Sequence, residues 1–129
     1  IVIEMILGIG IDVIEVKLIA KAIKNVHFLE RVYTSGELEF FQSRRGNPLP
    51  IAGNFAAKEA VAKALGTGFG TVKWTDVEIL RNAEGAPYVL LYGKAAEIFK
   101  HMGGSKIWIS ISHSKEYAVA QAIIEAGRE

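Results

Sequence analysis

A chain of 129 residues is the size of one ordinary domain and can bury a single hydrophobic core. Half of the residues are apolar and 22% are charged, which excludes a disordered chain, and the net charge of +1 does not indicate a nucleic-acid or membrane partner. The absence of cysteine excludes disulfides and thiolate metal sites. We expect one domain over residues 1–129 and, because no targeting signal is recognised, a cytoplasmic location.

The first apolar stretch, Ile1–Ile14, is interrupted by acidic residues and is too short to span a membrane. Its β-branched run predicts a buried strand over Met5–Ile11. Gly8 and Gly10 indicate that another backbone or a ligand approaches this strand closely. Asp12 follows the run, and two alternatives stay open for it: it caps the next helix, or it binds a ligand.

A helix is predicted over Glu15–Asn25 from the spacing of its apolar residues. Lys17, Lys21 and Lys24 recur at helical spacing and form one basic stripe. Such a stripe is usually solvated surface, but it is also what an acidic partner protein would bind.

Two further helical segments follow. A short helical turn is predicted over Phe28–Val32, and Thr34–Glu37 has the pattern of a capping box for a helix over Ser35–Arg44. The segment Arg44–Pro50, with two prolines and a glycine, predicts a loop.

The next helix is predicted over Phe55–Leu65, with Asn54 as its N-cap. One side is apolar, and the other carries Lys58, Glu59 and Lys63. This pattern favours a core helix whose solvated side holds a Glu59–Lys63 ion pair. The alternative is that one carboxylate and two ammonium groups line a site for a metal-bound polyphosphate.

Gly66 is expected to end that helix, and the loop Gly66–Gly70 matches neither the dinucleotide fingerprint nor the P-loop pattern. Strands and helices are mixed in the rest of the chain, with two predicted hairpins. The fold class is therefore α+β, a mostly antiparallel sheet packed with helices. The expected elements are strands over Thr75–Leu80, Pro87–Leu91, Lys106–Ser112 and Tyr117–Ile124, and a helix over Lys94–Met102.

Three polar residues lie where apolar patterns stop: Asp12, Glu59 and His113. No pair of histidines has metal-ligand spacing, which argues against zinc. Two lone carboxylates suit magnesium, which takes one or two protein carboxylates and completes its shell with water and phosphate oxygens. Lys58 and Lys63 could then neutralise the phosphates. Each residue also has an ordinary structural explanation, a turn histidine in the case of His113.

Three segments together resemble one family: Gly8–Asp12, Phe55–Gly68 and Ser110–Tyr117. The order and spacing of their residues are similar to those of holo-(acyl carrier protein) synthases, the small type of 4′-phosphopantetheinyl transferase. The resemblance extends from about Met5 to Glu125 and implies the 4′-phosphopantetheinyl transferase fold.

The resemblance implies a magnesium-dependent enzyme of fatty acid biosynthesis. Such enzymes move the phosphopantetheine arm of coenzyme A onto a serine of apo acyl carrier protein and release adenosine 3′,5′-bisphosphate. The family is typically a homotrimer with active sites between subunits. A non-catalytic protein that binds coenzyme A without transfer is the main alternative.

The family's site residues carry over by motif. Asp12 and Glu59 are the implied magnesium ligands, and the implied catalytic residues are Glu59, Lys63 and His113. Two proton acceptors are candidates: a water molecule held by Glu59 or Asp12, and the imidazole of His113. The residues implied to contact or shape the site for coenzyme A are Lys58, Lys63, Gly66, Thr67, Gly68, Gly85, Pro87 and His113.

The chain departs from the family pattern at two places. Leu18 stands where many members have an arginine that holds the acidic carrier protein, so Lys17, Lys21 and Arg31 are the candidate substitutes. Glu84 and Ala86 flank Gly85 where many members have Asn and Lys, which puts nucleotide contacts at this turn in doubt.

Overall fold

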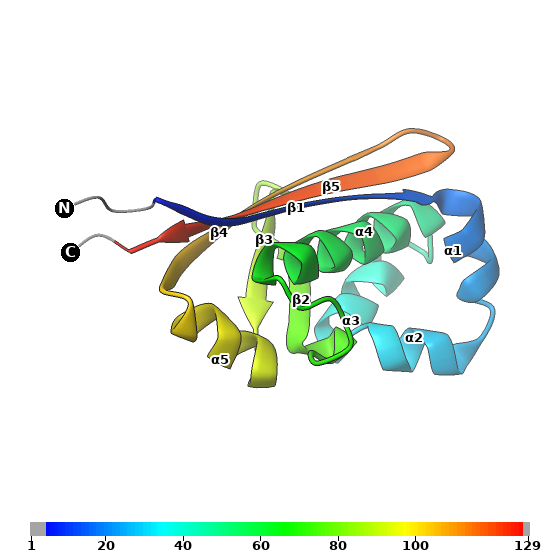
Figure 1. Cartoon of the computed structure of the whole chain (residues 1–129). Coiled ribbons are helices and arrows are strands. Elements are labelled where there is room, and N and C mark those ends of the chain that lie inside the picture. Colours follow the sequence, from blue (N-terminus) through cyan, green and yellow to red (C-terminus); the bar gives the residue numbers. More distant parts are fainter. Residues whose placement is uncertain (1–4, 128–129) are drawn as a thin grey trace.

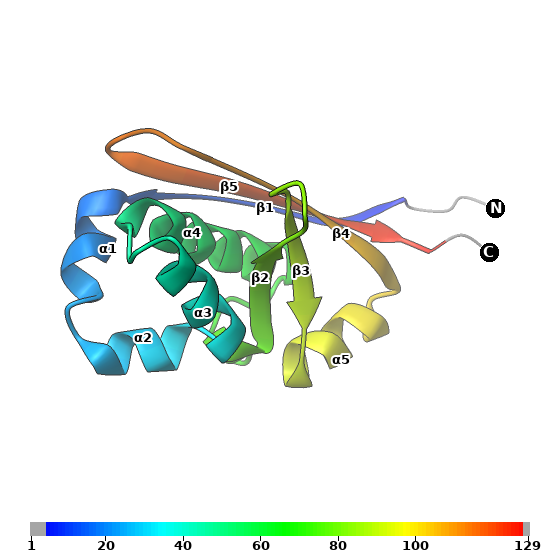
Figure 2. The same ribbon diagram turned by 180° about the vertical axis from the view of Figure 1, so that it is seen from behind.

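The structure is a computed structural model that describes residues 5–127, and within this range it has five α-helices and two antiparallel sheets (Figures 1 and 2). The strands are β1 (Ile6–Glu15), β2 (Val77–Arg81), β3 (Pro87–Leu91), β4 (Gly104–His113) and β5 (Tyr117–Ala126). The helices are α1 (Val16–Ala22), α2 (Val26–Val32), α3 (Ser35–Ser43), α4 (Pro48–Leu65) and α5 (Gly93–His101).

The predicted α+β class with antiparallel pairing is confirmed, although the strands form two sheets rather than one. The larger sheet has the order β1-β5-β4, and β2 pairs with β3 as a hairpin. Both views show the helices on one side of the larger sheet (Figures 1 and 2). No element within residues 5–127 covers its other face.

Helix α4 is the centre of the molecule. It lies against the larger sheet on one side, and the other helices and the β2–β3 hairpin surround the rest of it (Figure 1). From Ile51 to Leu65 every residue is buried except Phe55, Glu59 and Lys63. These three residues are spaced four apart and therefore form a single row along α4, the open row.

The start of α4 differs from the prediction. The helix begins at Pro48 with Asn47 as its N-cap, and Asn54 is a buried interior residue. Pro48 and Pro50 predicted a loop. Proline is nevertheless tolerated in the first turn of a helix, because N–H groups there have no carbonyl partner within the helix. The end is as predicted, because Gly66 takes the left-handed conformation, with φ 80°. The capping box of Thr34 with Glu37 is also confirmed.

The close approach predicted at Gly8 and Gly10 is confirmed. A Cβ atom on Gly10 would lie 1.8 Å from the Ala60 carbonyl oxygen, and one on Gly8 would lie 2.0 Å from the Ala64 carbonyl oxygen. Only glycine allows the backbone of β1 to touch the backbone of α4 in this way. This contact fixes the side chain of the next inward-facing residue, Asp12, against the helix.

Replacing Gly10 with Ala should lower the free energy of unfolding by at least about 2 kcal/mol, because the atoms that must move belong to the backbone of α4. Urea unfolding measures this loss. Gly70→Ala is the matched control, since a Cβ atom there meets nothing within 4 Å. Equal stability of the two variants would contradict the close packing of β1 on α4.

The buried apolar side chains form two clusters on either side of α4. One joins α4 to the sheets and α5, and the other joins it to α1, α2 and α3. No helix within residues 5–127 is long and apolar enough to cross a membrane.

Candidate active site

Asp12 lies inside a strand rather than at its end. Strand β1 continues to Glu15, four residues beyond the predicted boundary, and α1 begins at Val16. The N-cap of α1 is Glu15, whose side chain makes no capping hydrogen bond. The helix-cap alternative for Asp12 is therefore wrong, and its side chain instead faces α4 and is 16% exposed.

Lys63 reaches across from α4 to Asp12. Its Nζ lies 3.1 Å from Asp12 Oδ1 and 2.9 Å from the Ile11 carbonyl oxygen. Lys63 thus pairs with Asp12 and not with Glu59, so the predicted ion pair within the helix is wrong. Since the Lys63 side chain is 51% exposed, its ammonium group stays accessible to a ligand.

Glu59 lies one turn before Lys63 on the open row. Burial and the nearby negative charge of Asp12 raise the pKa of Glu59, and Lys63 opposes the rise. The two carboxylates are therefore close enough to repel each other, and one ammonium group only partly offsets that repulsion. A hard cation with oxygen ligands fits this donor set, as magnesium does.

Lys58 has no access to a ligand. It is fully buried, and its Nζ donates to Glu37 Oε1 at 2.5 Å and to the carbonyl of Val77. The prediction that Lys58 contacts coenzyme A phosphates is therefore wrong. Helical spacing alone assigned it to a solvated side, whereas α4 is covered on that side by α3 and β2.

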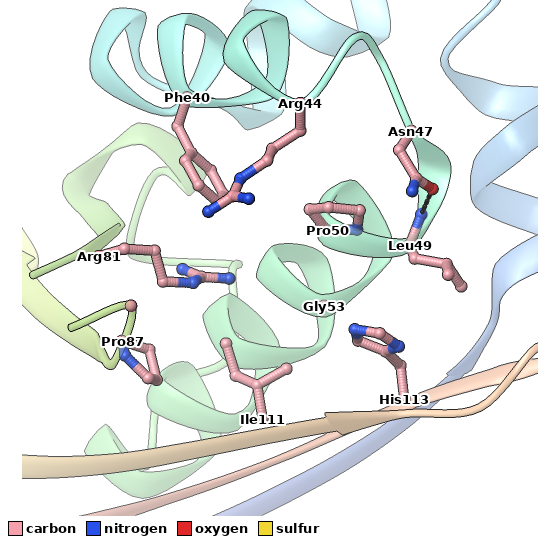
Figure 3. Close-up of a pocket in the computed structure, with 11 residues that line it drawn as sticks. Phe40, Arg44, Asn47, Leu49, Pro50, Gly53, Arg81, Pro87, Ile111 and His113 are labelled. Carbon is pink, nitrogen blue, oxygen red and sulfur yellow. Dashed lines mark hydrogen bonds between the residues drawn. The ribbon is translucent and has the colours of Figure 1, made fainter. Parts of the chain in front are cut away.

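A second set of polar residues surrounds a cavity of about 400 Å³ at the other end of α4 (Figure 3). Arg44 and Arg81 point into it from two elements, and His113 reaches it from the end of β4 (Figure 3). The predicted residues Gly85 and Pro87 also line it. No acidic residue of the described chain lines the cavity, so it is suited to an anion.

Sequence reasoning did not identify Arg44 and Arg81 as site residues. Arg44 belongs to the segment Arg44–Pro50, for which the sequence predicts only a loop, and Arg81 is the last residue of β2. The one signal for Arg81 was its place beside the turn that contains Gly85, since the β2–β3 hairpin pairs Arg81 with Pro87.

The chain does not bring His113 next to Asp12. Asp12 and His113 belong to β1 and β4, the two edges of the larger sheet, with β5 between them. Two strand spacings amount to roughly 9–10 Å. Within one chain His113 is therefore separated from the carboxylates by the width of β5, and its implied catalytic role stays a prediction.

The glycine-rich exit loop lies beyond Lys63. Gly66 and Gly68 both have positive φ, 80° and 62°, and the hydroxyl of Thr67 donates to the Gly68 carbonyl. The turn is therefore tight and specific to glycine. Its role in shaping a coenzyme A pocket stays a prediction, as do the binding roles of Gly85 and Pro87.

The candidate docking residues are all at the surface. Lys17 and Lys21 are exposed on α1, Arg31 is exposed on α2, and Leu18 is 55% exposed between the two lysines. A partner that binds α1 would meet two ammonium groups and one apolar side chain.

Comparison with known proteins agrees with this geometry. Residues 8–122 match the model of the 4′-phosphopantetheinyl transferase superfamily. A holo-[acyl-carrier-protein] synthase of Alkaliphilus metalliredigens is 54% identical over 120 residues, 92% of this chain and 98% of that protein. One of Clostridium tetani is 48% identical over 122 residues, 94% of this chain and 97% of that protein.

Solved structures show the same fold. A Bacillus anthracis holo-(acyl-carrier-protein) synthase in complex with CoA (3′,5′-ADP) has a TM-score of 0.81 and 38% identity, covering 96% of this chain and 100% of that one. A Helicobacter pylori holo-[acyl-carrier-protein] synthase in complex with coenzyme A has a TM-score of 0.80 and 31% identity, covering 90% and 98%. This chain therefore belongs to the 4′-phosphopantetheinyl transferase superfamily.

Proposed function

We propose that this protein transfers the 4′-phosphopantetheine group of coenzyme A to a serine of apo acyl carrier protein, releasing adenosine 3′,5′-bisphosphate for fatty acid biosynthesis. The observation that carries the proposal is the cluster of Asp12, Glu59 and Lys63, two carboxylates and one accessible ammonium group. A cytoplasmic location is part of the proposal, because a chain without cysteine fits a reducing compartment.

Asp12 and Glu59 would hold magnesium. When bound there, the ion neutralises the negative charge that grows on the leaving phosphate. Lys63 would bind a phosphate oxygen through its Nζ, because that group is half exposed and anchored on the carbonyl of Ile11. The donor set of this chain thus supplies both oxygen ligands and a cation at one place.

The reaction is a displacement at the β-phosphorus of coenzyme A. The serine hydroxyl oxygen forms a new P–O bond, and the P–O bond to the adenosine bisphosphate breaks on the opposite side. Lys63 stabilises the charge on the phosphate oxygens in the transition state. The serine proton passes to Glu59, through a water that it holds, or to His113.

The site is completed by a second copy of the chain in this proposal. Asp12 lies on β1, one edge strand of the larger sheet, and the cationic cavity borders β4, the other edge strand, so coenzyme A would bridge the edges of two subunits. The uncovered face of the sheet carries Ile9, Ile11 and Val13, which are 60%, 59% and 58% exposed. Apolar side chains gathered on one face indicate an interface. We expect a homotrimer by light scattering, and the mass of a single chain would contradict this part of the proposal.

The basic stripe of α1 would hold the acidic carrier protein. Replacing both Lys17 and Lys21 with Glu should weaken the affinity for apo carrier protein at least tenfold at low salt, since two attractive charges become repulsive. The affinity for coenzyme A should stay unchanged, because neither lysine lines the cavity. Calorimetric titration measures both affinities, and an unchanged carrier affinity would rule out docking on α1.

Intact-mass measurement of an apo carrier protein tests the proposed function. The carrier is incubated with this protein, coenzyme A and magnesium, and transfer appears as the added mass of one phosphopantetheine group.

A further inference from the structure

The guanidinium of Arg81 is held by a residue in the interior of the protein. Its Nη2 donates to Asn54 Oδ1 at 2.9 Å, and Asn54 is fully buried. The guanidinium also lies over the ring of Phe40, with 4.8 Å between its central carbon and the ring centroid. Arg81 therefore has a fixed direction, into the cavity (Figure 3).

The amide of Asn54 can face Arg81 in only one way. Its Nδ2 donates to Glu37 Oε2 and to the Ile79 carbonyl, each at 2.9 Å. Both partners are acceptors, so a flipped amide would place its oxygen against two other oxygens. Oδ1 must therefore point to Arg81, and Glu37, which accepts from Lys58 on its other oxygen, sets this orientation.

Arg81 forms no ion pair with a carboxylate of the described residues. Its hydrogen bonds go to the amide oxygen of Asn54 and, weakly, to its own strand at Leu80. Arg44 lies over the same ring of Phe40, at 5.4 Å. Two guanidinium groups thus lie together at a cavity that no acidic residue between positions 5 and 127 lines, and within that range each keeps N–H groups free for an anion.

We propose that Asn54 is a positioning residue that directs the Arg81 guanidinium at a phosphate group of coenzyme A in the cavity. The proposal rests on the proposed function and names one means by which this chain binds its substrate. Arg81 binds the phosphate, and Asn54 acts only through Arg81. Coenzyme A carries a pyrophosphate and a 3′-phosphate, and dephospho-coenzyme A, which lacks the latter, distinguishes them.

A double-mutant cycle tests the proposal. Asn54→Ala should raise the dissociation constant for coenzyme A about tenfold, because the guanidinium loses its direction. In an Arg81→Ala background the same substitution should have no further effect. The turnover rate at saturating coenzyme A should change little, so the loss appears in KM. Tyr33→Phe is the matched control, because it removes another buried hydrogen bond, 3.0 Å from Tyr33 Oη to the Ile51 carbonyl, away from Arg81.

The two ligands and the two backgrounds of the cycle distinguish which phosphate Arg81 binds and whether Asn54 acts through Arg81. A loss with coenzyme A but not with dephospho-coenzyme A supports binding of the 3′-phosphate, and an equal loss with both supports the pyrophosphate. An equal effect of Asn54→Ala with and without Arg81 would overturn the proposal. If Asn54→Ala does not fold, Arg81→Lys decides, since it keeps the charge but lacks the directed fork: full affinity would overturn the proposal, and a tenfold loss would support it. No binding of coenzyme A by the unmodified protein would instead contradict the proposed function.

Discussion

Replacing Glu59 with Gln should lower the rate of phosphopantetheine transfer by at least about 100-fold. The amide keeps the size of the side chain but removes one of two negative charges that would hold magnesium. Asp12 alone, already paired with Lys63 at 3.1 Å, would be a weak site. The affinity for coenzyme A should fall much less, because the cationic cavity does not include Glu59. Single-turnover assays with an apo carrier protein give the rate.

The control for this substitution is Glu97→Gln, which changes an exposed carboxylate on α5 in the same way. It should leave transfer unchanged. If Glu59→Gln kept a rate within a few-fold of the unmodified protein, the carboxylate pair would have no part in the chemistry.

Replacing Lys58 with Met should lower the free energy of unfolding by about 3–5 kcal/mol. Burial raises the pKa of Glu37 and lowers the pKa of Lys58, while the contact between them opposes both shifts. Removing the ammonium group leaves a carboxylate without its cation in a place that water does not reach. Urea unfolding measures the loss.

The double variant Lys58→Met with Glu37→Gln should recover part of that stability, because the buried charge is then removed as well. This comparison also separates the two roles considered for Lys58. A variant of Lys58 that kept its stability but lost affinity for coenzyme A would restore the phosphate-binding role that the structure contradicts.

Local signals in the sequence predicted much of the fold. The capping box at Thr34, the left-handed glycine at Gly66 and the strand Pro87–Leu91 depend on a few neighbouring residues, and all three are confirmed. The boundaries of β1 and α4 were wrong, because pairing with β5 extends the strand and because prolines are tolerated in the first turn of a helix.

The candidate site was predictable only in part. Asp12, Glu59 and Lys63 were identified from family motifs, and the structure brings them together. Lys58 was misplaced because helical periodicity cannot distinguish a solvated side from a side covered by another element. Arg81 was missed because its function depends on contacts with Asn54 and Phe40, which are 27 and 41 residues away in sequence.

These misses have one physical cause. Helix α4 is covered on nearly all sides, so its polar residues divide between a buried network and the open row of Phe55, Glu59 and Lys63. The same helix therefore anchors the buried ion pair, the carboxylate cluster and, through Asn54, the arginine of the cavity. Long-range packing decides which polar residue serves which purpose, and a single sequence does not show it.

The mass of an apo acyl carrier protein after incubation with this protein, coenzyme A and magnesium tests the central claim most directly. We predict a gain of one phosphopantetheine group on the carrier, which disappears when a chelator removes the magnesium. Several apo carriers should be tried, because the preferred carrier is not fixed by the site. No gain in mass with any of them, while the protein is folded and binds coenzyme A, would contradict the account and favour a protein that binds coenzyme A without transferring its arm.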